Sequence, residues 1–360
     1  KALANRMDEH RILILCFNIT LAAHLRSLLH SDDSNPQYRE RIEVLHFNDW
    51  AKSILGRLPN PKELRENENY DEVLGNRVLA ALNDRDLEEK WDAILVDEAH
   101  TFAPNWFTCS VAAVKGGENG SLMIVNDISQ GLYNRRKFTW SSVGIKAQGR
   151  SKKLNQNYRN TQETLTAAWN IVQSSLGEIE EDPTFPIVEP SAALRNGKKP
   201  VLYRAKSKAS AVKALVDRVR SLCNSGYAQS EIAILYRSIG QNDRVLFQEM
   251  IKQLKDSDLK NYWVTENKYT KQNYSVRIPG VRIITALSSL GLEFKVVLIL
   301  WADQFWDCCS DDVEKAQLAR KQLYVAMTRA QDELHLYGSG SAQILRELEA
   351  SQGFEVVRER

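Results

Sequence analysis

A hydrophobic run followed by two carboxylates is the first feature of this sequence that could do chemistry. Residues 93–96 are apolar, and Asp97, Glu98 and His100 come directly after them. A buried strand of this kind would deliver both carboxylates at its carboxyl end. In a phosphoryl-transfer site, the first carboxylate can hold Mg²⁺ and the second can position or deprotonate the attacking water. The same residues could instead form an acidic strand end that caps the next helix.

A second apolar stretch leads to an aspartate and a glutamine. Residues 121–125 precede Asp127, and Gln130 follows within the next turn. A glutamine at this place could hydrogen-bond a γ-phosphate or the water that attacks it. Alone the pattern is weak, because Asn126, Asp127 and Ser129 also suit an ordinary turn.

Two arginines stand close to aromatic residues near predicted helix ends or turns. Tyr158 precedes Arg159, and Tyr324 stands shortly before Arg329. The planar guanidinium bonds phosphate oxygens in pairs and keeps its charge, which suits it to phosphate binding. An isolated arginine is more often part of a surface salt bridge.

Composition allows two domains but does not identify a ligand. The chain has 360 residues, 43% of them hydrophobic, and a net charge of +2, so any nucleic-acid site must be local. No apolar run approaches the roughly 20 residues of a membrane span, and residues 1–10 do not resemble a secretory signal. The five cysteines lack Cys-x-x-Cys spacing, which favours reduced thiols in a cytoplasmic protein without membrane contact.

Strands and helices are predicted to alternate, which indicates a doubly wound parallel sheet. Ligands of such sheets bind at the carboxyl ends of the strands, where Asp97 and Asp127 would lie. In the first part of the chain, strands are expected at 11–17, 42–47, 93–96 and 121–125, with helices at 21–29 and within 51–90.

The alternating pattern restarts near residue 153. We therefore expect a first domain over 1–152, with a short helical insertion near 51–90, and a second domain over 153–360. A helix over 161–175 would be capped by Asn160 or Thr161, and 176–200 resembles a loop. Further strands are expected at 201–204, 231–236, 281–286 and 296–301, with helices near 208–224 and 241–255, and a helix at 312–328 and a strand at 334–337 that close the domain.

Taken in order, these segments resemble the conserved boxes of the UvrD/Rep family of superfamily 1 helicases. The resemblance implies an α/β fold with two RecA-like domains, each a parallel sheet flanked by helices, that bind ATP and Mg²⁺ across a cleft. The segments that carry it are 14–25, 44–50, 97–100, 127–133, 157–159, 285–294 and 324–330.

The resemblance also implies a role for each matching residue in ATP hydrolysis. Asp97 resembles the Mg²⁺ ligand, Glu98 the catalytic base and Gln130 the γ-phosphate sensor. Arg159 and Arg329 resemble the two arginine fingers that stabilise charge in the transition state.

Other matching residues would contact the nucleotide or single-stranded DNA. Tyr158 resembles the aromatic residue that stacks on adenine, and Gly291 and Glu293 fall in a segment that contacts the nucleotide. For Phe17 and Phe47, the alternative is ordinary packing in the core. The residues in DNA-contacting segments are Phe17, Asn18, His46, Phe47, Tyr133, Arg135 and Thr285.

The sequence departs from the family pattern at several positions. Leu290 stands where the family usually has lysine, Asn126 where it has glycine, and Arg135 where it often has tryptophan. No Gly-x-x-x-x-Gly-Lys-Ser/Thr loop occurs, and Lys1 is followed by Ala2. We therefore expect this phosphate-binding loop upstream of Lys1, and a chain that does not hydrolyse ATP without it.

The resemblance implies an ATP-dependent DNA helicase or translocase of the kind used in DNA repair. Its partner would be single-stranded DNA or a junction of single and double strands, with 3′→5′ movement. One alternative is an RNA-directed or nuclease-fused member of the family, and the other is a single-strand-binding or regulatory module that has lost turnover. The departures at Leu290 and Asn126 favour this second alternative, whereas Glu98, Arg159 and Arg329 argue against it.

Overall fold

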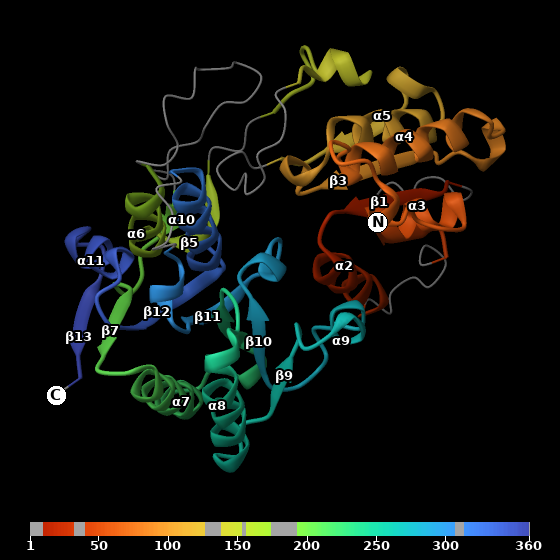
Figure 1. The fold of residues 1–360 in the computed structure, drawn as a ribbon. Coiled ribbons are helices and arrows are strands. Elements are labelled where there is room, and N and C mark those ends of the chain that lie inside the picture. The colour runs from red at the N-terminus through yellow and green to blue at the C-terminus, as the bar shows by residue number, and fades with distance from the viewer. Residues whose placement is uncertain are drawn as a thin grey trace. The chain divides into compact units, whose positions relative to one another are not determined.

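The computed structural model describes residues 10–31, 40–126, 138–152, 156–173, 193–306 and 313–359 (Figure 1). The chain divides into two compact units, Lys1–Lys152 and Lys153–Arg360. Each unit has a parallel sheet of its own, with helices packed against it. The predicted α/β architecture of parallel sheets flanked by helices is therefore confirmed.

The first unit is built on a four-stranded sheet in the order β2-β1-β3-β4. Its strands are parallel, and β1 and β3 at its centre are mostly buried, as the short apolar runs predict. The strands are β1 (Ile12–Cys16), β2 (Ile42–His46), β3 (Ala93–Asp97) and β4 (Ser121–Ile124), and the helices are α2 (Ile19–Ser31), α3 (Phe47–Leu55), α4 (Tyr70–Asn83) and α5 (Pro104–Ala113).

Aromatic side chains form much of the core of the first unit. Phe47 at the start of α3 stacks on Trp106 of α5, with ring centroids 3.8 Å apart and planes 4° from parallel. Phe102 meets both rings edge-on. These contacts hold the region after β2 against the region after β3, and both regions carry predicted site residues.

The second unit is built on a seven-stranded parallel sheet in the order β13-β7-β12-β11-β8-β10-β9. Two further strands, β5 (Asn157–Thr161) and β6 (Ala193–Arg195), pair with each other. The strands of the large sheet are β7 (Val201–Ala205), β8 (Ile232–Tyr236), β9 (Asn261–Trp263), β10 (Val281–Thr285), β11 (Phe294–Ile299), β12 (Ala330–Ser339) and β13 (Glu355–Arg358).

Helices cover both faces of this sheet (Figure 1). On one face, α7 (Lys208–Asn224) and α8 (Arg244–Asp256) lie side by side over the central strands. On the other face, α6 (Gln162–Val172) packs against α10 (Val313–Met327). The remaining helices of this unit in the described residues are α9 (Lys268–Gln272) and α11 (Gln343–Ala350).

Several sequence expectations for the second unit are wrong in detail. The chain does not close the unit with a strand at 334–337, because α11 and β13 follow, and β13 pairs with β7 at the sheet edge. The stretch 176–200 includes β6, and the short β9 was not predicted. Of the two residues predicted to cap α6, Asn160 and Thr161, the structure confirms Thr161, since its hydroxyl accepts the amide hydrogen of Thr164.

Candidate functional site

The carboxyl ends of three strands bring predicted residues of the first unit together. In the sheet register, Cys16 pairs with both His46 and Asp97, so β1, β2 and β3 end at the same level. Phe17 directly follows β1, and Glu98 directly follows β3. Six of the predicted residues in this unit therefore lie along one sheet edge: Phe17, Asn18, His46, Phe47, Asp97 and Glu98.

The backbone of Glu98 adopts a left-handed conformation, with φ 52° and ψ 45°. A residue with a Cβ atom rarely adopts it, and such strain gathers at functional sites. Neighbouring hydrogen bonds hold the turn: the amide of Glu98 donates to Asp97 Oδ1 at 2.9 Å, and the Thr101 hydroxyl donates to the Glu98 carbonyl oxygen at 2.6 Å. The Glu98 carboxylate lies 3.5 Å from His100 Nδ1. The turn thus presents two adjacent carboxylates at the end of β3.

Asp97 and Glu98 fit the chemistry of a Mg²⁺-nucleotide site. Magnesium is commonly bound by one or two protein carboxylates together with substrate phosphates. Both side chains are partly buried at the end of a strand, where such ligands bind. At no place in the described residues, this one included, do three or more His, Cys, Asp or Glu side chains gather as they would to hold a metal ion by themselves.

The thiol of Cys16 lies beside this carboxylate pair. Burial, together with the negative charges of Asp97 and Glu98, raises the pKa of Cys16 far above its ordinary value. The thiol therefore stays protonated and is a poor nucleophile. Cys16 acts as a small apolar core residue here.

The predicted DNA-contacting residues of the first unit differ in how they are placed. Phe47 is completely buried and stacked on Trp106, which agrees with the alternative of core packing, and its predicted contact with DNA stays a prediction. Phe17 is only half-buried, with its ring 6.1 Å from that of His46. Asn18 Oδ1 accepts the amide of Thr20 at the start of α2.

His46 also has a structural task, because its Nδ1 accepts the amide hydrogen of Asn48 and caps α3. That bond places the proton of a neutral ring on Nε2. Gln130, Tyr133 and Arg135 lie outside the described residues, so their predicted roles remain predictions.

Three predicted segments of the second unit converge. Arg159 on β5 forms an ion pair with Glu293, with its Nε 2.8 Å from a carboxylate oxygen. The amide of Phe294 donates to the Arg329 carbonyl oxygen at 3.0 Å. The segments 157–161, 285–294 and 324–330 are therefore joined by direct bonds, although they lie far apart in the sequence.

Tyr158 and Arg159 extend outward from this cluster. Tyr158 is 70% exposed, so its aromatic side chain is accessible to a ligand. The Arg159–Glu293 ion pair is also partly exposed, and ion pairs of this kind contribute about 0–1 kcal/mol. A polyanionic ligand could therefore replace Glu293 as the partner of Arg159 at little cost.

Arg329 is completely buried. Its guanidinium donates to the carbonyl oxygens of Val325 at 3.0 Å and Leu292 at 3.3 Å, and to the Thr328 hydroxyl at 3.2 Å. To act as the predicted phosphate contact, the side chain would have to exchange these acceptors for phosphate oxygens. In this conformation it ties the end of α10 to the segment before β11.

The segment before β11 explains one departure from the family pattern. Leu290, which replaces a lysine, is 2% exposed and belongs to the core. Gly291 follows with φ 75°, a left-handed conformation that favours glycine. Thr285 ends β10, where its hydroxyl accepts the amide hydrogen of Ser288. The segment 285–294 therefore brings Glu293 to Arg159 while the uncharged Leu290 packs in the core.

Two functional candidates were missed from the sequence. The Asn160 amide donates to the carbonyl oxygens of Thr328 and Ala330. Arg195 on β6 donates to the carbonyl oxygens of Arg159, at 2.6 Å, and of Gln331, at 2.8 Å. Neither residue has a sequence signal for these bonds, because the carbonyl groups that they contact lie in distant segments of the chain.

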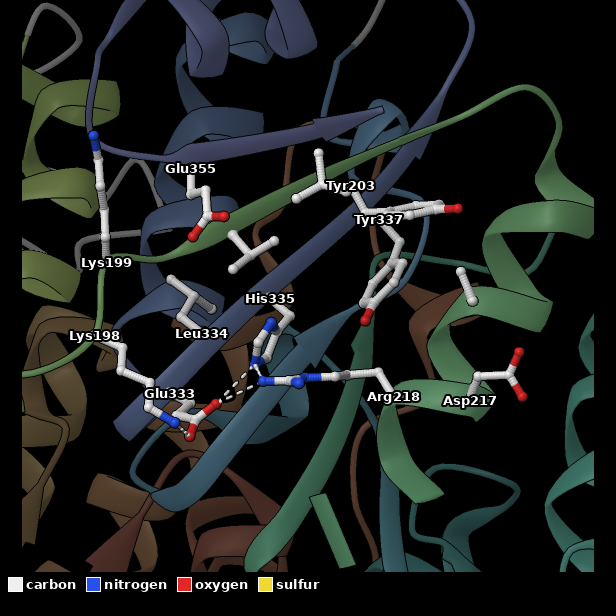
Figure 2. A pocket seen from close by; sticks show the side chains of 13 residues that line it. Lys198, Lys199, Tyr203, Asp217, Arg218, Glu333, Leu334, His335, Tyr337 and Glu355 are labelled. Atoms are coloured by element: carbon white, nitrogen blue, oxygen red, sulfur yellow. Dashed lines mark hydrogen bonds and ion pairs between the residues drawn. The ribbon is translucent and has the colours of Figure 1, made fainter. Parts of the chain in front are cut away.

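A pocket of about 770 Å³ opens elsewhere in the second unit, against β7, β12, β13 and α7 (Figure 2). At its base, the buried Glu333 accepts bonds from Lys198 at 2.6 Å, Arg218 at 3.0 Å and His335 at 3.2 Å (Figure 2). Hydrogen bonds from His335 and Lys198 lower the pKa of Glu333 to about 2. Glu333 is thus matched by three polar partners within the pocket, and none of the predicted site residues lines the pocket.

Comparison with known proteins gives one family match. Residues 152–269 match the model of the UvrD-like helicase C-terminal domain. DNA helicase II of Salmonella typhimurium is 27% identical over 172 residues, and DNA helicase II of Escherichia coli is 28% identical over 172 residues. Each alignment covers 46% of this chain and 22% of the relative's length.

A solved structure is also similar to this chain. The C-terminal domain of a possible DNA helicase from Lactobacillus plantarum matches with a TM-score of 0.38 and 20% identity, covering 56% of this chain and 98% of that one. No helix in the described part of the chain has the length and apolarity of a membrane span.

Proposed function

We propose that this chain, which carries a UvrD-like helicase C-terminal domain at residues 152–269 and is homologous to part of DNA helicase II, belongs to an ATP-driven DNA motor. The motor would move along single-stranded DNA, in the 3′→5′ direction, and separate duplexes. The observation that carries the proposal is the convergence of the segments around Arg159, Glu293 and Arg329 in the second unit. A family match alone would not require those segments to meet.

In this proposal, each unit contributes different groups to ATP turnover. Bound ATP and Mg²⁺ would supply the phosphoryl group and neutralise charge on its oxygens. Asp97 would hold the metal, and a Glu98 carboxylate oxygen would take the proton of the attacking water. Both carboxylates are fixed by the strained turn after β3, so they need little rearrangement to act.

The second unit would bind the base and stabilise the developing charge. The exposed Tyr158 ring offers a stacking face for adenine, and Arg159 can leave Glu293 for a phosphate oxygen. Arg329 would contribute only after its guanidinium leaves the Val325 and Leu292 carbonyl oxygens. Gln130 is proposed as the sensor of the γ-phosphate.

Single-stranded DNA is the proposed partner. Phe17 presents a half-exposed ring at the edge of the first sheet, and Thr285 ends a strand in the second unit. Stacking of one base on an aromatic ring is worth about 1–3 kcal/mol and tolerates any sequence. Tyr133 and Arg135 are proposed to add to this contact.

The test is ATP hydrolysis with and without an oligothymidine. Residues 1–360 contain no Gly-x-x-x-x-Gly-Lys-Ser/Thr loop, so we expect no turnover from them alone. A version of the protein that contains such a loop should show turnover that oligothymidine stimulates. Glu98→Gln should lower that turnover by about 10²–10⁴-fold, because a glutamine cannot accept the proton. The exposed Glu88→Gln is the matched control and should leave it unchanged.

Turnover by residues 1–360 that Glu98→Gln abolishes would contradict the expectation that a Gly-x-x-x-x-Gly-Lys-Ser/Thr loop is needed, although it would support the proposed motor. Single-strand binding without turnover in the loop-containing version would instead support a binding or regulatory module. Unwinding of duplexes with a 3′ or a 5′ tail then decides the direction of movement.

A further inference from the structure

Asn160 joins two segments that both carry a predicted arginine finger. Its side chain is 2% exposed, and its Nδ2 donates to the carbonyl oxygens of Thr328 at 2.9 Å and Ala330 at 2.7 Å. These two carbonyl groups lie on either side of Arg329. On its own strand, Asn160 directly follows Arg159.

The orientation of the Asn160 amide is fixed by Asn157. The Nδ2 of Asn157 donates to Asn160 Oδ1 at 3.1 Å, so the oxygen of Asn160 is already an acceptor. Two carbonyl oxygens can only be met by a donor, which places Nδ2 toward Thr328 and Ala330. Asn157 is held in turn, because its Oδ1 accepts the amides of Arg159 and Asn160, each at 2.9 Å.

Three successive carbonyl groups around Arg329 are thereby fixed. Asn160 holds those of Thr328 and Ala330, and the Phe294 amide donates to that of Arg329 itself. The backbone on either side of Arg329 is consequently held by Asn160 on β5, and the Arg329 carbonyl group is held by Phe294 on β11. Strand β5 also carries Arg159.

We propose that Asn160 is a positioning residue that fixes Arg329 relative to Arg159. The inference rests on the proposed function, in which both arginines act on one phosphoryl group. A displacement of about 1 Å in a catalytic group can cost on the order of 10²-fold in rate. The bonds from Asn160 to the carbonyl oxygens of Thr328 and Ala330, called the Asn160 clamp below, hold the two arginine-bearing backbones in place. Their loss should therefore affect turnover more than nucleotide binding.

The test compares Asn160→Asp with Asn170→Asp. Aspartate keeps the size of asparagine but loses both donors toward the two carbonyl oxygens. Asn170 is a matched control in the same unit, since its half-buried amide also donates to a backbone carbonyl, that of Ser351. Asn160→Ala, which adds no charge, replaces the aspartate variant if that variant does not fold.

The first measurement is hydrogen exchange in residues 1–360, which needs no turnover. Exchange of the Phe294 amide and of the peptide 324–330 should speed up at least tenfold in Asn160→Asp and stay unchanged in Asn170→Asp. Equal exchange in both variants would overturn the clamp itself.

The second measurement is steady-state turnover by the loop-containing version. Asn160→Asp should lower kcat about 10²-fold with a KM for ATP within threefold of the unmodified protein. A kcat that matches Asn170→Asp, or a change in KM or melting temperature alone, overturns the positioning role. Absence of turnover in the unmodified protein overturns the proposed function and this role with it, whereas hydrogen exchange still decides the clamp.

Discussion

At the scale of single residues, Arg329 combines a structural and a proposed catalytic task. Its guanidinium is buried against the carbonyl oxygens of Val325 and Leu292. Removing a buried donor leaves its acceptors unsatisfied, at a cost of about 1–3 kcal/mol. Stability and turnover must therefore be measured together for any variant at this position.

We predict that Arg329→Ala lowers both the stability of the protein and its turnover of ATP, but to different degrees. In the loop-containing version, kcat should fall about 10³–10⁵-fold, as for other arginine fingers, while unfolding becomes easier by about 1–3 kcal/mol. Arg329→Lys should restore part of the stability but little of kcat, because an ammonium lacks the planar fork. Nucleotide affinity and kcat per folded molecule are the measurements. A collapse of affinity with kcat unchanged within a few-fold would make Arg329 a ground-state binding residue.

The left-handed backbone at Glu98 gives a second prediction at this scale. Glu98→Gly and Glu98→Ala both remove the carboxylate, but only glycine adopts φ 52° without strain. The glycine variant should therefore unfold with a free energy about 1 kcal/mol higher than the alanine variant. Urea denaturation of residues 1–360 measures the difference. An alanine variant equal to or more stable than the glycine variant would show that the turn relaxes in solution.

Some site residues can be located from the sequence, and others cannot. Asp97 and Glu98 follow an apolar strand, so their place at a sheet edge is a local property. The burial of Phe47 depends on Trp106, which lies on another helix. Asn160 bonds to carbonyl groups 168 and 170 positions away, and no local pattern announces such a partner.

At the scale of elements, the polar cluster on β12 links the stability of the second unit to pH. Glu333 is 4% exposed on its side chain and bonded to Lys198, Arg218 and His335. Burial lowers the pKa of His335, so the ring is neutral and donates to the ionised Glu333. The cluster connects β12 with α7 and with the segment before β7.

We predict that this cluster is lost in acid. The Glu333 pKa is lowered from 4.5 to about 2, so the carboxylate adds stability that is present above pH 4.5. This contribution is lost as the pH falls from 4.5 through about 2, where Glu333 becomes protonated in the folded chain. The lowered pKa of His335 acts in the same direction, since the unfolded chain binds its proton first below pH 6.5.

The test compares the unmodified chain with Glu333→Gln between pH 7 and pH 2. The variant should be less stable at pH 7, and the difference in the free energy of unfolding should shrink as the pH falls through the range from 4.5 to 2. If the free energies of unfolding of the two proteins ran parallel over this pH range, the ionisation of Glu333 would not contribute to stability.

The central strands and the long helices of the second unit can be predicted from the sequence pattern, whereas the edge strands of its sheet cannot. The fully buried β8 is an apolar run of β-branched and aliphatic residues, so its type is evident. The edge strand β13 is short and mostly exposed, and it exists because β7 offers it hydrogen bonds. The three residues of β9 are likewise defined by pairing with β10.

At the scale of the whole molecule, the two units differ in how far apart in sequence their paired strands lie. In the first unit, β1 pairs with the nearby β2, and β3 with β4. In the second unit, β7 pairs with β12 and β13, which complete the sheet only near the end of the described residues. Alternating strands and helices predict parallel pairing, but not this order of strands.

The placement of β7 has a consequence during protein synthesis. Val201 leaves the ribosome well before its partners His335 and Glu355 have been translated. At about 5–20 residues per second, the delay is on the order of ten seconds. Throughout that interval, β7 is present in the nascent chain with both of its edges unpaired. Chaperones bind to unpaired strands of this kind, and aggregation begins at them. Strands β1 to β4 of the first unit can pair with one another during this interval, because all four have already been translated.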